Sequence, residues 1–136
     1  VIDYDKWLNS FTINTLAPMK MAEVFLPQIK RSGRKLIVNI SSLMGSLADN
    51  GSGGSILYRS SKAALNASMK SLSIDIKDQG IGVLILHPGW VRTDMGGQNG
   101  LIDCETSVGG MRDVIENFSL AQTGSFIKYD GKPMPW

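Results

Sequence analysis

The residues best suited to proton transfer are Tyr58 and Lys62, which stand four positions apart. On a helix that spacing places both side chains on one face. A phenol exchanges protons poorly at neutral pH, but a neighbouring ammonium stabilises the phenolate and makes the exchange easier. Because a Tyr-x-x-x-Lys pair also arises by chance on many helices, these two residues alone indicate acid–base catalysis only weakly.

Two other polar features could assist Tyr58. Ser41 and Ser42 end an apolar run, where a hydroxyl could polarise a carbonyl oxygen; the alternative is that they serve in a turn or a cap. Asn14 is a poor helix former four residues before Pro18, so a disturbed backbone with an exposed carbonyl is one interpretation. The other is that Asn14 faces solvent or caps a bend.

A third feature is the segment Pro-Gly-Trp-Val-Arg-Thr at residues 88–93, which follows a second apolar run. It is either a simple turn or a segment whose backbone and hydroxyl groups contact a flat polar ligand. The sequence alone leaves both interpretations open.

The helices and strands that must position these groups alternate along the chain. The spacing of apolar residues predicts helices over residues 4–30 and 58–77, and a third helix is expected over 105–118. Short apolar runs predict strands over 35–41, 82–87 and 125–129. Pro18 and Pro27 should bend or interrupt the first helix.

This alternation predicts an α/β fold with right-handed crossovers, a parallel sheet and helices on both faces. Three strands make a thin sheet, which corresponds to one side of a doubly wound fold. Ligands of such sheets bind beyond the carboxyl ends of the strands, here at Ser41–Ser42 and at His87 to Gly89. We expect a single domain over residues 1–136.

Composition argues against several other functions. The 136 residues carry a net charge of +2 from 14 basic and 12 acidic side chains, which is no footprint for nucleic acid. No apolar run approaches the roughly 18 residues that span a membrane, and no secretory leader is visible. His87 and Cys104 are the only residues of their types, so no pair of His or Cys residues has metal-ligand spacing. The lone cysteine favours a reducing, cytoplasmic location.

Taken together, the motifs resemble the short-chain dehydrogenase/reductase family in order and spacing. The matching stretches are "INTLAP" around Asn14, "LIVNISSLMGS", "YRSSKAALN" and "HPGWVRTDM", which cover nearly the whole chain. The loop before Tyr58, the segment "HPGWVRTDMGG" and the closing "DGKPMPW" are most similar to the branch of bacterial C-factor and sniffer-type carbonyl reductases.

The resemblance implies a role for each catalytic residue. Tyr58 would be the general acid/base, and Lys62 would favour its phenolate and hydrogen-bond the nicotinamide ribose. Ser42, rather than Ser41, would hold the substrate carbonyl. Asn14 would hold a water in a proton relay from Lys62 to solvent.

The same resemblance implies a nicotinamide cofactor. Pro88, Gly89, Val91 and Thr93 would orient the carboxamide, beside Tyr58 and Lys62. Whether the cofactor is NAD or NADP is left open, because the residues that distinguish them lie outside this chain.

One departure from the family pattern concerns cofactor affinity. No Thr-Gly-x-x-x-Gly-x-Gly turn and no Asn-Asn-Ala-Gly stretch occurs in the sequence. The resemblance therefore implies that about 90 residues, with the N-terminal dinucleotide-binding strands of the Rossmann-like fold, precede this C-terminal part. The first residue, Val1, is consistent with a start upstream.

Two hypotheses follow for function. The first is an NAD(P)-dependent oxidoreductase that, in its full-length form, reduces a small carbonyl compound or oxidises an alcohol; the isolated chain would have little cofactor affinity. The second is a non-enzymatic fragment that acts as an interaction or signalling module. Family members often pair through two long helices, here residues 4–30 and 58–78, so a homodimer is expected.

Overall fold

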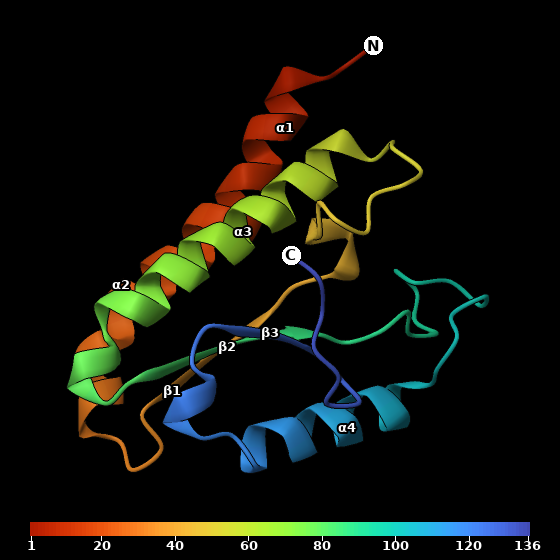
Figure 1. Ribbon diagram of the computed structural model, residues 1–136. Coiled ribbons are helices and arrows are strands. Elements are labelled where there is room, and N and C mark those ends of the chain that lie inside the picture. The colour runs from red at the N-terminus through yellow and green to blue at the C-terminus, as the bar shows by residue number, and fades with distance from the viewer.

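The computed structural model describes residues 1–136 and contains the predicted alternation of helices and strands (Figure 1). The helices are α1 (Tyr4–Phe11), α2 (Ala17–Arg31), α3 (Ile56–Asp75) and α4 (Cys104–Glu116), and the strands are β1 (Leu36–Ile40), β2 (Gly82–His87) and β3 (Ser125–Lys128). A π-helical turn at Thr12–Leu16 joins α1 to α2, and 3₁₀ turns occupy Leu43–Gly45, Lys77–Gln79 and Leu120–Gln122.

The sheet has the order β1-β2-β3, and both strand pairs are parallel. Helices α2 and α3 pack on one face of the sheet and α4 on the other (Figure 1). This arrangement confirms the predicted doubly wound, Rossmann-like architecture. None of the helices combines the length and the apolar character that crossing a bilayer requires.

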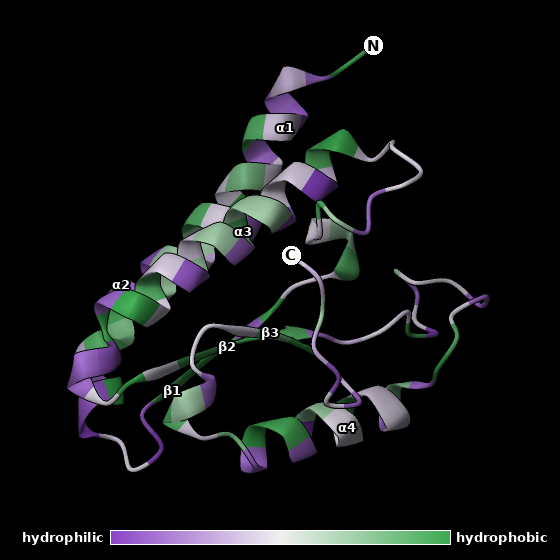
Figure 2. Ribbon diagram, in the orientation of Figure 1, coloured by the Kyte–Doolittle hydropathy of each residue, from purple (hydrophilic) through white to green (hydrophobic).

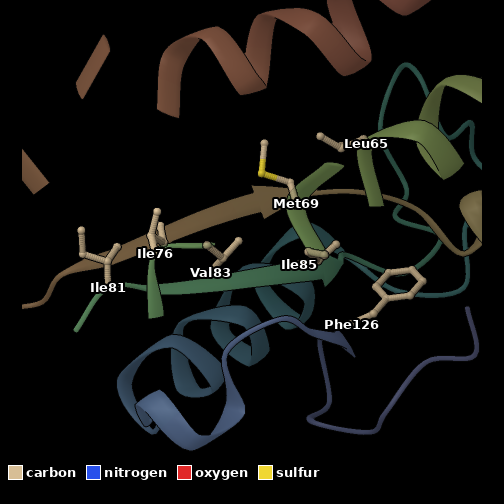
Figure 3. Packing of buried hydrophobic residues seen from close by; sticks show 7 residues of the cluster. All are labelled: Leu65, Met69, Ile76, Ile81, Val83, Ile85 and Phe126. Atoms are coloured by element: carbon tan, nitrogen blue, oxygen red, sulfur yellow. The ribbon is translucent and has the colours of Figure 1, made fainter. Parts of the chain in front are cut away.

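Strand β2 is the centre of the core because its side chains are buried on both faces. Val83 and Ile85 point toward α3, where they pack with Leu65 and Met69 (Figure 3). Leu84 and Leu86, which alternate with them, form a second cluster with Ile127 on the α4 side. A parallel strand covered by helices on both faces must be apolar throughout. This explains the unbroken run that predicted it.

Both prolines of the first predicted helix were expected to bend or interrupt it, and Pro27 does not interrupt it. Pro18 follows the π-helical turn, in which the N–H of Ala17 bonds to the carbonyl of Thr12, five residues back. Pro27, however, lies inside α2 without interrupting it. The carbonyl of Glu23 loses its α-helical partner there, but both residues are exposed, so water can hydrate it.

The two edges of the sheet differ. The outer edge of β3 is covered by the chain's own tail, since Lys128 N–H bonds to Lys132 C=O and Met134 N–H bonds to Phe126 C=O. No strand covers the outer edge of β1, where Ile40 is 49% exposed. Apolar residues run along the strands and also recur on the outer surface of α1 and α2 (Figure 2).

Candidate active site

Tyr58 and Lys62 lie in the first two turns of α3 and share a face, as their spacing predicts. The Lys62 Nζ is 5.8 Å from the centroid of the Tyr58 ring. Tyr58 is half-buried, and its hydroxyl makes no hydrogen bond within the chain. The phenol oxygen is therefore available to a ligand, with a cation beside its ring.

The ammonium of Lys62 is anchored at the end of the sheet. It donates to the backbone carbonyl of Ile40, the last residue of β1, at 3.2 Å. The Ile40 carbonyl and the Ser41 N–H belong to one peptide unit and point in opposite directions. Because the Ser41 N–H bonds to Leu86 on β2, the Ile40 carbonyl points to the uncovered side of β1. Partial burial lowers the pKa of Lys62, which makes its ammonium a readier proton donor.

Ser42 caps the 3₁₀ turn that follows β1, and this turn packs against α3. A Cβ on Gly45, the last residue of the turn, would lie 2.9 Å from Asn66 Nδ2 and 3.0 Å from the backbone carbon of Lys62. Only a glycine lets the turn approach the helix this closely. The Ser42 turn is thereby held against the same part of α3 that carries Lys62.

The two serines at the end of β1 have different surroundings. Ser41 is buried, and its hydroxyl donates to Asn66 Oδ1 at 2.6 Å. Ser42 is half-buried, and its Oγ accepts from Met44 N–H at 3.1 Å. Because Ser42 acts there only as an acceptor, its own O–H remains free to donate to a substrate oxygen.

Asn14 lies in the π-helical turn and faces α3. Its Nδ2 donates to Ser61 Oγ at 3.0 Å, and the neighbouring Thr15 hydroxyl donates to Ser61 C=O at 2.8 Å. Pro18 has no N–H to offer the Asn14 carbonyl in the α-helical pattern. Asn14 and Lys62 also line one cavity of about 390 Å³ along the open edge of β1.

The segment after β2 folds into a compact loop. Gly89 has φ +84°, and a Cβ there would lie 2.8 Å from Ile102 Cδ1 and 2.9 Å from Tyr129 Cε1, so the turn needs glycine. Ile102 bonds through its own backbone to Trp90 and Arg92, which flank Val91.

Val91 and Thr93 present free polar groups on this loop. The N–H and C=O of Val91 point away from Ile102 and make no hydrogen bond within the chain. The Thr93 hydroxyl accepts from Gly96 N–H at 3.0 Å, which leaves its proton free to donate. These groups match the donors and acceptors of a flat amide such as nicotinamide.

The structure thus brings Asn14, Ser42, Tyr58 and Lys62 to the carboxyl end of β1, while Pro88, Gly89, Val91 and Thr93 follow the adjacent strand. Sequence reasoning missed Gly45, Ser61 and Asn66, which hold these residues in place.

Sequence reasoning placed His87 at a strand end where ligands bind, but it gave the side chain no role. His87 Nδ1 accepts the N–H of Leu43 at 3.1 Å. The one available signal was its position directly before Pro88-Gly89, at a strand end. No group of three or more His, Cys, Asp or Glu side chains is placed to hold a metal ion.

C-signal of Myxococcus xanthus is 40% identical over 135 residues, which cover 99% of this chain and 81% of that protein. Among solved structures, the carbonyl reductase Sniffer of D. melanogaster superposes with a TM-score of 0.96 at 38% identity. An NADPH-bound carbonyl reductase from chicken fatty liver gives a TM-score of 0.92 at 36% identity.

The chain spans only 59% of each of these two reductase chains, although they cover 100% and 99% of it. The sequence model of the family described as short chain dehydrogenase matches residues 2–101. With the fold, the match and the relatives in agreement, this chain belongs to the short-chain dehydrogenase/reductase family.

Proposed function

We propose that residues 1–136 form the catalytic domain of an NAD(P)-dependent oxidoreductase that reduces a carbonyl group or oxidises an alcohol. The observation that carries this proposal is the position of the Lys62 ammonium, between the Tyr58 ring and the carboxyl end of β1. The free O–H of Ser42 on the turn beside Lys62 supports it.

In the reductive direction, Tyr58 gives its proton to the carbonyl oxygen of the substrate. Ser42 donates a hydrogen bond to that oxygen and so stabilises the negative charge that develops there. Lys62 favours the phenolate left on Tyr58 and takes part in its reprotonation, for which Asn14 and the cavity it shares with Lys62 offer a path for water. When bound, the nicotinamide cofactor supplies or accepts the hydride.

The residues present fit the nicotinamide half of such a cofactor. The unpaired N–H and C=O of Val91 and the hydroxyl of Thr93 would hold the carboxamide, and Lys62 would reach the adjoining ribose. Gly89 and Pro88 shape the turn that presents Val91. Phosphate recognition usually needs a glycine-rich turn at a helix N-terminus, and residues 1–136 contain no such turn after a strand. The residues that fit the nicotinamide half do not distinguish NAD from NADP, because this half is the same in both cofactors.

The proposal has two measurable parts. The full-length protein should oxidise NADH or NADPH in the presence of hydrophobic aldehydes or ketones, whereas residues 1–136 alone should bind both cofactors only weakly. Nicotinamide fluorescence measured during titration of the isolated chain tests the second part, and micromolar affinity would contradict it. Absence of turnover by the full-length protein with either cofactor over a broad carbonyl panel would contradict the first.

A second candidate function is that of an interaction or signalling module. Its support is the similarity to C-signal, 81% of which is covered by this chain, together with the uncovered edge of β1 and the exposed apolar side chains of α1 and α2. If the chain acts as an interaction module, Tyr58→Phe leaves the biological effect of the protein intact. If that effect requires enzymatic turnover, the same substitution abolishes it.

A further inference from the structure

His87 ends β2, and its imidazole reaches across to the turn that carries Ser42. The Nδ1 atom accepts the N–H of Leu43 at 3.1 Å. A nitrogen that accepts a hydrogen bond carries no proton, so the ring is neutral with its proton on Nε2. Burial, assisted by the positive charge of Lys128 and opposed by Asp49, lowers the pKa of His87 to about 4, so the ring stays neutral near pH 7.

The backbone on the other side of His87 is fixed. Its carbonyl accepts from the N–H of Tyr129 at 2.9 Å, and the next carbonyl, of Pro88, accepts from the Ser107 hydroxyl at 2.6 Å. The first contact comes from the segment after β3 and the second from α4. The imidazole is therefore mounted on a rigid part of the sheet rather than on a loop.

The contact with Leu43 matters because Ser42 lies directly before it. On the other side of Ser42, the N–H of Ser41 bonds to Leu86 C=O at 2.7 Å. Ser42 is thus held between two hydrogen bonds to β2, one from Ser41 to the backbone and one from Leu43 to the His87 ring. Its Oγ is directed in turn by the N–H of Met44 within the same 3₁₀ turn.

We propose that His87 is a positioning residue for the reaction, which fixes the Ser42 hydroxyl by holding the N–H of Leu43 on Nδ1. The inference rests on the proposed oxidoreductase function and deepens it. His87 does not touch the substrate in this role. It acts through the backbone of the turn, and it connects that turn to the strand from which the Pro88–Thr93 segment departs.

The test compares two substitutions in the full-length protein. His87→Asn keeps an acceptor, Oδ1, where Nδ1 was, whereas His87→Leu has similar bulk but no acceptor. We expect kcat for carbonyl reduction to fall about tenfold to a hundredfold in His87→Leu, with cofactor affinity unchanged, and to be largely kept in His87→Asn. Equal kcat in the leucine variant and the wild type would overturn the proposal, as would an equal loss in both variants.

A double-mutant cycle separates positioning from general packing. In a Ser42→Ala background there is no hydroxyl to orient, so adding His87→Leu should cause no further loss of kcat. A further loss of the same size as in the wild-type background would show that His87 acts by another route.

Amide hydrogen exchange supplies a readout that does not depend on turnover. The N–H of Leu43 should exchange on the order of tenfold faster in His87→Leu than in the wild type or His87→Asn. Unchanged exchange would overturn the inference even if the enzyme is active. Failure of the proposed function is recognised separately, by a Tyr58→Phe variant that turns over as fast as the wild type.

Discussion

The ammonium of Lys62 donates to the carbonyl of Ile40 at 3.2 Å, although 22 residues separate them. This bond ties helix α3 to the last residue of β1, at the strand end where ligands of parallel sheets bind. It also fixes the cation 5.8 Å from the centroid of the Tyr58 ring. The position of the acid–base pair is thus set by the sheet as well as by the helix that carries it.

Removal of the Tyr58 hydroxyl should abolish proton transfer while leaving the fold intact. In full-length Tyr58→Phe we expect kcat to fall on the order of 10²–10⁴-fold, since the phenylalanine ring has no proton to give to the substrate oxygen. Cofactor affinity, measured by fluorescence titration, should change little. Tyr4→Phe, at a tyrosine 67% exposed on α1, is the matched control. A kcat as high in Tyr58→Phe as in this control would exclude the assigned role.

Close packing of the Ser42 turn on α3 should make Gly45 sensitive to a single added methyl group. In Gly45→Ala the Cβ would lie 3.0 Å or less from Lys62 and Asn66 atoms, so the turn must move away from the helix. We expect the free energy of unfolding to fall by about 1–3 kcal/mol, measured by urea denaturation. Gly51→Ala is the control, because no heavy atom lies within 4 Å of its added Cβ. Equal stability of the two variants would show that the turn has room to spare.

The neutral state of His87 predicts a stability that depends on pH. Burial lowers its pKa from 6.5 to about 4 in the folded chain, so the unfolded chain binds a proton first as the pH falls. The contribution of His87 is complete above pH 6.5, declines as the pH falls to about 4 and is constant below that. The contribution of His87 to the free energy of unfolding is up to about 2 kcal/mol, which is less than the full pKa shift implies because solvent screens a half-buried ring.

Urea unfolding of the wild type and His87→Asn between these two pH values isolates this contribution. As the pH is lowered, the free energy of unfolding of the wild type should fall relative to that of His87→Asn. Parallel pH profiles would mean that His87 titrates alike in the folded and unfolded chains.

Pairing of two copies through the long helices should depend on the exposed face of α3. Ile74 is 65% exposed there, so Ile74→Glu would bury a charge in such an interface and should reduce the molar mass from dimer to monomer in sedimentation experiments. Val108→Glu, at a residue 52% exposed on α4, should leave the mass unchanged. A monomeric wild type, or dissociation by the α4 variant alone, would rule out this interface.

Much of the fold followed from the sequence because its signals are local. The sequence predicted three helices, the first of which the structure divides into α1 and α2 by a π-helical turn, and the three strands to within a few residues. Tyr58 and Lys62 share a helix, so their spacing alone placed them on one face. The motifs around Asn14, Ser42 and residues 88–93 established the family, which the comparisons confirm.

Contacts between distant segments were decided only by the tertiary structure. The approach of Gly45 to α3, the bond from Asn14 to Ser61 and the bond from Leu43 to His87 each join residues at least 17 positions apart. The effect of Pro27 on α2 also depended on tertiary structure, because the helix continues where solvent can reach the carbonyl of Glu23. The residue types that do the chemistry were thus determined locally, whereas the hydrogen bonds that hold them depend on how helices and strands pack, which no local pattern encodes.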